Sequence, residues 1–287
     1  MCALVCKLPR NATQLKVLNL MEIYKEKTRL FLPKDSIDQN ALAQIDNILT
    51  LPFVKGIAIM PDVHLGKGSC VGAVVSTEGA IVPSIVGVDI GCGMIAVKTP
   101  FHKEDLPEDL SQIRKGIECR IPLSAGVFNQ KIQETARRRI EELKAIAEID
   151  YSTIDSKWEY ALGSLGSGNH FIEITVDEND EVWAFLHSGS RGIGNKIATK
   201  HIKIAQGLME KWHITLKDPD LAYLPEGTKE FDDYIRDMNW AQKFAFLNRE
   251  EMMDRVLTEL NYSVFRFHTM DLERINCHHN FTQKEHH

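Results

Sequence analysis

Five short segments of the sequence combine glycines with side chains that can bind a metal ion or a phosphate. In chain order they are 60–68 (MPDVHLGKG), 87–94 (GVDIGCGM), 165–173 (LGSGNHFIE), 186–192 (LHSGSRG) and 276–280 (NCHHN). Each lies at the end of an expected strand or helix, where a rigid scaffold can present side chains to a ligand. We therefore expect the segments to form one chemical site.

Four of these segments carry candidate metal ligands. The candidates are Asp89, Cys92, His170, His187, and either His278 or His279. Asp89 and Cys92 stand on one turn, which the glycines at 91 and 93 allow to be tight. A carboxylate and a thiolate on one turn could bind one ion or bridge two. Imidazoles together with these groups suit zinc, manganese or iron, and the ligand types alone do not choose among them.

Each feature taken singly has a plainer interpretation. A lone histidine beside a strand is usually a polar residue with satisfied hydrogen bonds, and we interpret four histidines in this way: His102, His201, His213 and His268. A glycine-rich segment can be only a turn. The joint occurrence of all five segments is what favours a functional site.

The composition excludes several classes of protein. Over 287 residues, 44% are hydrophobic and 26% are charged, which is typical of a soluble domain. The net charge of −6 argues against a broad basic surface for nucleic acid, so any such surface must be local. The cysteines show no disulfide or four-cysteine zinc spacing. No signal peptide or membrane-length apolar run stands out, so we expect a cytoplasmic protein.

The elements that must position the site are strands first and helices later. Short runs rich in Val and Ile, punctuated by Gly and Pro, predict strands at 53–60, 70–76, 81–88, 94–98, 170–176 and 181–187. Helical patterns occur at 104–118, 130–149, 193–212 and about 232–260. This order predicts an α+β fold with a mixed β-sheet core and long amphipathic helices, in a single catalytic domain over 1–287.

Together, in this order and with similar spacing, the five segments resemble the RtcB family of RNA ligases, from about residue 50 to 287. The resemblance implies an RtcB-like fold and a GTP-dependent reaction with manganese. That reaction joins RNA ends bearing a 2′,3′-cyclic phosphate or 3′-phosphate to 5′-hydroxyl ends. A histidine–GMP intermediate transfers GMP to the RNA 3′-phosphate. The implied partners are GTP and RNA, such as broken tRNA or other cleaved RNA ends, with no membrane.

The resemblance also implies a metal role for individual residues. Cys92 would bridge two manganese ions. His170 would complete the protein ligands of the first ion, and Asp89, His187 and His279 would hold the second. Thiolate bridging would keep the two ions close together.

Further residues are implied to contact nucleotide or RNA. Asn169 would contact the GTP phosphates, and Phe171 and Glu173 would help hold the guanine, whose donor pattern a carboxylate can accept. Arg191 resembles a residue that grips a phosphate, for which its planar guanidinium is suited. Asp62 resembles an active-site carboxylate that ligation needs.

Two other functions stay open at this stage. In the family, the nucleophilic histidine follows the His-His-Asn motif at a distance, so we expect it beyond residue 287. A two-metal phosphohydrolase would need no such histidine, and it would have no use for a guanine-binding set at Asn169, Phe171 and Glu173. A non-catalytic RNA-binding fragment could retain the metal as a structural element.

Overall fold

The computed structural model describes residues 21–264 and 273–285 of the chain. The chain forms two compact units, each built from discontinuous segments. The first unit comprises Met1–Gly87, Thr199–Ile235 and Thr282–His287, and the second comprises Val88–Ala198 and Arg236–Phe281. Two of the four boundaries fall inside long helices, and the other two follow Gly87 and Phe281. The single catalytic domain expected from the sequence stays a prediction.

The first unit is built around a four-stranded sheet in the order β1-β2-β3-β4. Its strands are β1 (Glu22–Lys25), β2 (Thr28–Leu30), β3 (Val54–His64) and β4 (Val71–Thr77). Strands β2 and β3 pair in parallel and the other pairs are antiparallel, so the sheet is mixed. Helix α2 (Gln39–Leu49) packs its apolar stripe, including Ile45 and Ile48, against Val54, Ile57 and Ile59 of β3.

Smaller elements complete the first unit. They are η1 (Lys34–Ser36), β5 (Ala80–Ile81), α3 (Pro83–Val86), η4 (Pro219–Leu221) and β9 (Leu224–Pro225). Strands β5 and β9 form an antiparallel pair of their own.

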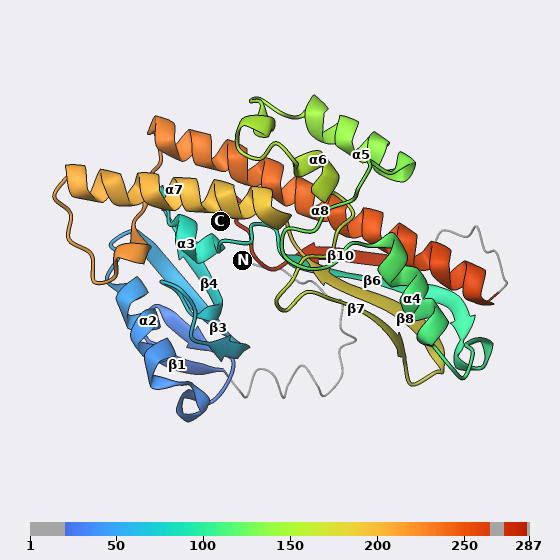
Figure 1. Ribbon diagram of the computed structural model, residues 1–287. Helices are drawn as coiled ribbons and strands as arrows, with labels where there is room; N and C mark the ends of the chain where they lie inside the picture. Colours follow the sequence, from blue (N-terminus) through green and yellow to red (C-terminus); the bar gives the residue numbers. More distant parts are fainter. Residues whose placement is uncertain (1–20, 265–272, 286–287) are drawn as a thin grey trace. The chain divides into compact units, whose positions relative to one another are not determined.

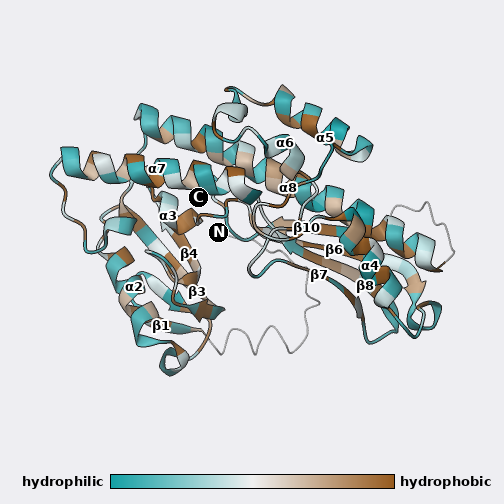
Figure 2. Ribbon diagram, viewed as in Figure 1, coloured by the Kyte–Doolittle hydropathy of each residue, from teal (hydrophilic) through white to brown (hydrophobic). Residues whose placement is uncertain are grey.

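The second unit is an antiparallel sheet in the order β10-β6-β8-β7 (Figure 1). Its strands are β6 (Gly93–His102), β7 (Phe171–Val176), β8 (Glu181–Ser188) and β10 (Arg274–His278). Helix α8 (Lys229–Val264) covers one face, where Met252 and Val256 pack on Ala184 and Leu186. Side chains alternate along β8, so His187 points to the face opposite α8. The strands are apolar and the outer helix faces hydrophilic (Figure 2).

The second unit has further helices: η2 (Lys103–Asp105), α4 (Ser111–Arg120), α5 (Glu134–Ala145), η3 (Tyr151–Thr153) and α6 (Trp158–Ala161). Helix α7 (Arg191–Lys211) begins in the second unit, and its residues from Thr199 onward belong to the first. None of the helices in the described residues combines the length and the hydropathy of a membrane span.

The α+β class is confirmed, with three local corrections. The strand expected at 81–88 is wrong: β5 ends at Ile81 and a short helix follows, because Pro83 suits the first turn of a helix. The helix expected at 104–118 starts only at Ser111, beyond Pro107. Strand β10 was not predicted, since its sequence RINCH carries little β pattern.

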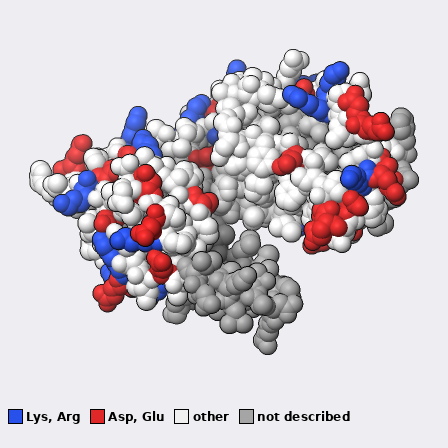
Figure 3. All heavy atoms as spheres, turned by 90° about the horizontal axis from the view of Figure 1, so that it is seen from below, with Lys and Arg blue, Asp and Glu red and all other residues white. Residues whose placement is uncertain are grey.

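Charges of both signs are interspersed over the coloured residues of the face drawn in Figure 3. This distribution agrees with the net charge of −6, and the expectation that any nucleic-acid surface is local stays a prediction.

Candidate metal centre

Four strand ends meet at one end of the second unit's sheet. Strands β6 and β7 begin where β8 and β10 end, so Gly93 pairs with Ser188 and His278, and Phe171 pairs with His187. All the candidate ligands stand at or near these positions: Asp89, Cys92, His170, His187 and His279. The antiparallel topology thereby brings together residues that are far apart in the sequence.

The ligand atoms form two groups that share the Cys92 thiol. One group holds Cys92, His187 and His279, and the other holds Asp89, Cys92 and His170, each with its ligand atoms within 4.8 Å of one another. The Cys92 Sγ lies 3.2 Å from Nε2 of His187 and 3.5 Å from Nε2 of His170. Nε2 of His187 lies 3.2 Å from Nε2 of His279. Each group could hold one divalent ion, and the Cys92 sulfur would be available to both.

Asp89 is turned toward the His170 group. Its Oδ2 lies 3.0 Å from Nε2 of His170, and its Oδ1 accepts the backbone N–H of Ser190 at 3.1 Å, just before helix α7. The resemblance instead implied that Asp89 shares an ion with His187 and His279. In the structure, Asp89 is instead grouped with His170, because the His170 ring and the Ser190 N–H both contact its carboxylate.

Backbone carbonyls orient two of the imidazoles. Nδ1 of His170 lies 2.9 Å from the carbonyl oxygen of Leu165, and Nδ1 of His187 lies 3.0 Å from that of Asn169. A carbonyl can only accept, so Nδ1 is the donor in each ring. The neutral ring then presents an unprotonated Nε2 to the cluster, which is the arrangement found for histidines that bind metal ions.

The electrostatics of the cluster suit a cation. Burial raises the pKa of the Cys92 thiol, and the neighbouring Asp89 carboxylate raises it further. Burial lowers the pKa of His187, which favours the neutral ligand form. Burial acts to raise the pKa of Asp89, but its hydrogen bond to His170 holds that pKa below the usual value. Binding of a divalent cation to such a thiol releases its proton.

Two glycines permit the close packing of the segments that carry the ligands. A Cβ at Gly189 would collide with both carboxylate oxygens of Asp89, so no larger residue fits between β8 and α7 without moving that ligand. Gly166, at a φ of 99°, lies against the Arg191 guanidinium, and a Cβ there would stand 2.8 Å from Nδ1 of His170. Both positions therefore need glycine for space, and Gly166 also needs it for its backbone angle.

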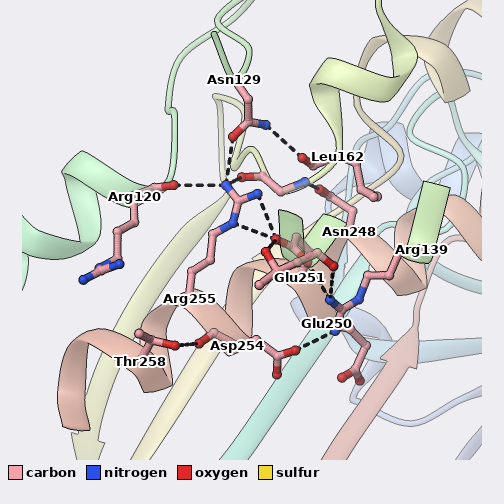
Figure 4. A network of polar contacts seen from close by, with 12 residues as sticks. Arg120, Asn129, Arg139, Leu162, Asn248, Glu250, Glu251, Asp254, Arg255 and Thr258 are labelled. Carbon is pink, nitrogen blue, oxygen red and sulfur yellow. Dashed lines mark hydrogen bonds and ion pairs between the residues drawn. The ribbon is translucent and has the colours of Figure 1, made fainter. Parts of the chain in front are cut away.

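The loop that carries His170 is held from behind by buried polar side chains of helix α8 (Figure 4). Arg255 donates to the carbonyl of Gly163 at 2.9 Å and to Oδ1 of Asn129 at 2.8 Å. Glu251 is fully buried and pairs with both Arg255 and Arg139. These contacts give the glycine-rich loop a fixed backbone, which a ligand-bearing loop needs.

The two neighbouring histidines of the fifth segment separate clearly. His279 lies in the cluster, while Nδ1 of His278 lies 2.9 Å from the carbonyl oxygen of Gly91. Their positions follow from the backbone, since the N–H of His279 donates to the carbonyl of Cys92 at 2.8 Å as β10 ends. Of the alternatives left open by the sequence, the geometry favours His279.

The residues implied to hold nucleotide lie beside the cluster. Phe171 is 38% exposed, and its ring centroid lies 5.7 Å from that of His187. Glu173 is exposed and stands two positions along β7, so it shares the sheet face of Phe171. Asn169 is exposed, and its backbone carbonyl orients His187. These side chains are accessible to a ligand, and their role stays a prediction.

Arg191 begins helix α7 in a strained conformation. Its φ is 59°, a left-handed value that is costly for a residue with a side chain. Its Nε donates to Oγ of Ser164 at 3.0 Å, and within the described ranges its terminal nitrogens make no hydrogen bond or ion pair. The guanidinium is thus held at one nitrogen and keeps its terminal donors for an anion. Burial lowers its pKa.

Asp62 lies at the exposed end of β3 in the first unit. Its backbone carbonyl lies 2.8 Å from Nδ1 of His64. Its proposed contribution to the reaction therefore stays a prediction.

Two residues of the centre were missed by the sequence analysis. Asn248 and Arg249 on α8 are both fully buried, and their polar atoms contact the segments that carry the ligands. A signal was present, because the helical period of Ala241, Ala245 and Met252 places the pair on the buried stripe of the helix.

The sheet end and its thiol, imidazole and carboxylate cluster define an α+β protein with a candidate two-metal centre. The family model described as tRNA-splicing ligase RtcB matches residues 44–287. RNA-splicing ligase RtcB of Escherichia coli strain K12 is 46% identical over 268 residues, covering 88% of this chain and 66% of that protein. The tRNA-splicing ligase RtcB of Methanococcus maripaludis is 30% identical over 301 residues, covering 88% of this chain and 62% of that protein.

The chain therefore belongs to the RtcB family. A further relative, tRNA-splicing ligase RtcB of Pyrobaculum aerophilum, is 30% identical over 258 residues, covering 74% of this chain. The chain spans 66% of the length of the E. coli relative and 53% of the P. aerophilum one.

Proposed function

We propose that this chain provides the metal centre of a GTP-dependent RNA ligase, which joins 2′,3′-cyclic phosphate or 3′-phosphate RNA ends to 5′-hydroxyl ends. The observation that carries the proposal is the double ligand group around Cys92 in a member of a family whose relatives are named RNA- or tRNA-splicing ligases. The proposed substrates are broken tRNA or other cleaved RNA ends, and a cytoplasmic location is part of the proposal.

The donor set fits two manganese ions. Each group offers the Cys92 sulfur together with imidazole or carboxylate atoms, a combination that borderline divalent ions accept. When bound, the ions would neutralise the triphosphate and polarise the α-phosphorus of GTP. The protein's own part is to fix the ligand atoms, which the carbonyls of Leu165 and Asn169 do for His170 and His187.

GTP is proposed to bind beside the cluster, along the exposed face of β7. Phe171 offers an accessible ring for the base, and the Glu173 carboxylate can accept hydrogen bonds from the guanine edge. The Asn169 side chain and the free end of the Arg191 guanidinium would contact phosphates. A phosphohydrolase that uses metal-bound water needs no base-binding set, so the exposure of these residues favours the ligase.

The five clustered residues are proposed as ligands and not as the nucleophile. The histidine that carries GMP is expected beyond residue 287, and that expectation stays a prediction. Asp62 is proposed as a carboxylate that assists ligation.

The test is an adduct and ligation assay on the protein as it is encoded. With GTP and manganese, mass spectrometry should find GMP on one histidine other than His170, His187 and His279. An RNA with 3′-phosphate and 5′-hydroxyl ends should then be joined, while Cys92→Ala should do neither and Cys277→Ala should do both. Release of free phosphate without an adduct would favour the phosphohydrolase. RNA binding that neither GTP nor metal alters would favour a non-catalytic role.

A further inference from the structure

Arg249 stands behind the metal centre as a fully buried cation. In the described part of the chain it donates to two carbonyls and one amide and lies beside an imidazole, with no carboxylate within ion-pairing distance. A buried guanidinium without an ionic partner is costly, because desolvation disfavours its charge. Burial lowers its pKa to about 10, so the charge is still present at neutral pH. A buried charge of this kind is expected to have a specific role.

The contacts of the Arg249 nitrogens indicate that role. Nη1 donates to the carbonyl of Gly91 at 2.7 Å and to that of Ser188 at 3.0 Å. The first carbonyl belongs to the turn between Asp89 and Cys92, and the second directly follows His187. One nitrogen atom therefore ties together the backbones of two ligand-bearing segments.

The remaining nitrogens of Arg249 reach the fifth segment, which carries His279. Nε donates to Oδ1 of Asn276 at 2.7 Å. Nη2 lies 3.1 Å from Nδ1 of His278, a close contact and not a hydrogen bond when that Nδ1 donates to the carbonyl of Gly91. Both residues lie on β10, immediately before the ligand His279. Asn276 is itself anchored, because its Nδ2 donates to Oε1 of Glu250 at 2.9 Å.

The preceding residue, Asn248, contacts the loop that carries His170. Its Oδ1 accepts the N–H of Gly163 at 2.7 Å, and its Nδ2 donates to the carbonyl of Gly189 at 3.1 Å and to that of Ser164 at 3.3 Å. Gly163 and Ser164 begin the loop that carries His170. Adjacent residues of one helix thus contact every segment that contributes a ligand.

We propose that Arg249, assisted by Asn248, is the positioning residue of the metal centre, fixing the spacing of the ligand-bearing backbones through fork hydrogen bonds that lysine cannot reproduce. The inference rests on the metal centre proposed above. Replacement of groups that orient metal ligands typically lowers metal affinity about 10- to 100-fold. Arg249→Lys keeps the charge but carries its donors on a single nitrogen, which cannot span the acceptors at Gly91, Ser188 and Asn276, so its loss of affinity should fall in that range.

The test is a titration of the metal-free protein with Co²⁺, which reports affinity and, through thiolate-to-cobalt charge-transfer absorption, the geometry at Cys92. Arg236→Lys is the matched control. Arg236 also lies on α8, and its Nε and Nη2 both donate to Oδ1 of the buried Asp237 on the same helix. Both variants should melt at lower temperature than the wild type. Only Arg249→Lys should bind Co²⁺ about 10- to 100-fold more weakly, with an altered charge-transfer band.

A second variant keeps the test decisive if Arg249→Lys does not fold. Asn276→Ala removes the acceptor of Nε and leaves the other contacts of Arg249, so it should lower Co²⁺ affinity less than Arg249→Lys and alter the same band. Unchanged affinity and spectrum in both Arg249→Lys and Asn276→Ala would overturn the inference, as would an equal loss in Arg236→Lys. If the wild type binds no Co²⁺, or Cys92→Ala binds it equally well, the metal centre itself is wrong.

Discussion

At the scale of single residues, Cys92 is the side chain that joins the two ligand groups. Cys92→Ala should remove most of the bound metal, because each group loses a ligand at once. Cys70→Ala and Cys277→Ala are the controls, since Cys70 lies in the core of the first unit and Cys277 in β10 outside the cluster. Metal analysis of the purified variants decides the point. Equal metal content in all three would exclude Cys92 as the shared ligand.

Arg191 is predicted to contact phosphate through its terminal nitrogens, which make no hydrogen bond or ion pair to the described residues. Arg191→Lys should weaken GTP or RNA binding about tenfold or more, because lysine offers a point charge in place of a fork. Equilibrium binding and thermal melting are measured together. Arg114→Lys, in an exposed ion pair with Glu118, should change neither. A lower melting temperature with unchanged binding would show that Arg191 is only structural.

The candidate ligands could be picked out from the sequence because chemistry and glycines coincide in short segments. The grouping of Asp89 with His170 could not, since it depends on the backbone N–H of Ser190. The role of Arg249 could not be predicted either. A polar residue on the buried stripe of a helix signals a partner, but the sequence does not say that its partners are the carbonyls of Gly91 and Ser188.

At the scale of elements, the buried ionic contacts of α8 hold the His170 loop from behind. Glu251 is fully buried and accepts from Arg139, Arg255 and Thr135. Glu251→Gln should lower the free energy of unfolding by about 3 kcal/mol, since it leaves two guanidinium groups without their buried partner. Chemical denaturation measures this loss. Glu118→Gln, in the exposed pair with Arg114, should cost below about 1 kcal/mol. Similar losses in both variants would contradict the ionic role of Glu251.

The junction between β8 and α7 is predicted to be intolerant of a side chain. Gly189→Ala should displace the Asp89 carboxylate, and metal content should fall because one of the two ligand groups is broken. Gly207→Ala on α7 is the control, since a Cβ there meets nothing within 4 Å. It should leave metal content intact and stabilise the helix by roughly 0.5–1 kcal/mol. Intact metal content in Gly189→Ala would show that the junction can relax.

The elements were predictable where the apolar pattern was strong. Strands β3, β4, β6, β7 and β8 and the long helices α7 and α8 follow from Val- and Ile-rich runs and helical periodicity. Strand β10 was not predicted, because its pairing with β6 and not its composition makes it a strand. Helix α3 was not predicted, because its apolar residues were interpreted as a strand, whereas the proline among them favours the start of a helix.

At the scale of the whole molecule, the order of elements along the chain did not reveal the two compact units. Each compact unit is assembled from separate stretches of chain, and only long-range contacts define them. Composition was informative in a limited way: a net charge of −6 agrees with the interspersed charges in Figure 3. The α+β class followed from the order of strands and helices, whereas the division into units required the pairing of strands distant in the sequence.

The most direct measurement of the central claim is anomalous X-ray scattering at the manganese edge from crystals of the manganese-loaded protein. The account predicts two peaks about 3.5–4 Å apart that flank the Cys92 Sγ, one beside His170 and one beside His187 and His279. Crystals of Cys92→Ala grown in the same way should show weaker peaks or none. Peaks at other places on the molecule, or an empty cluster at saturating manganese, would contradict the account.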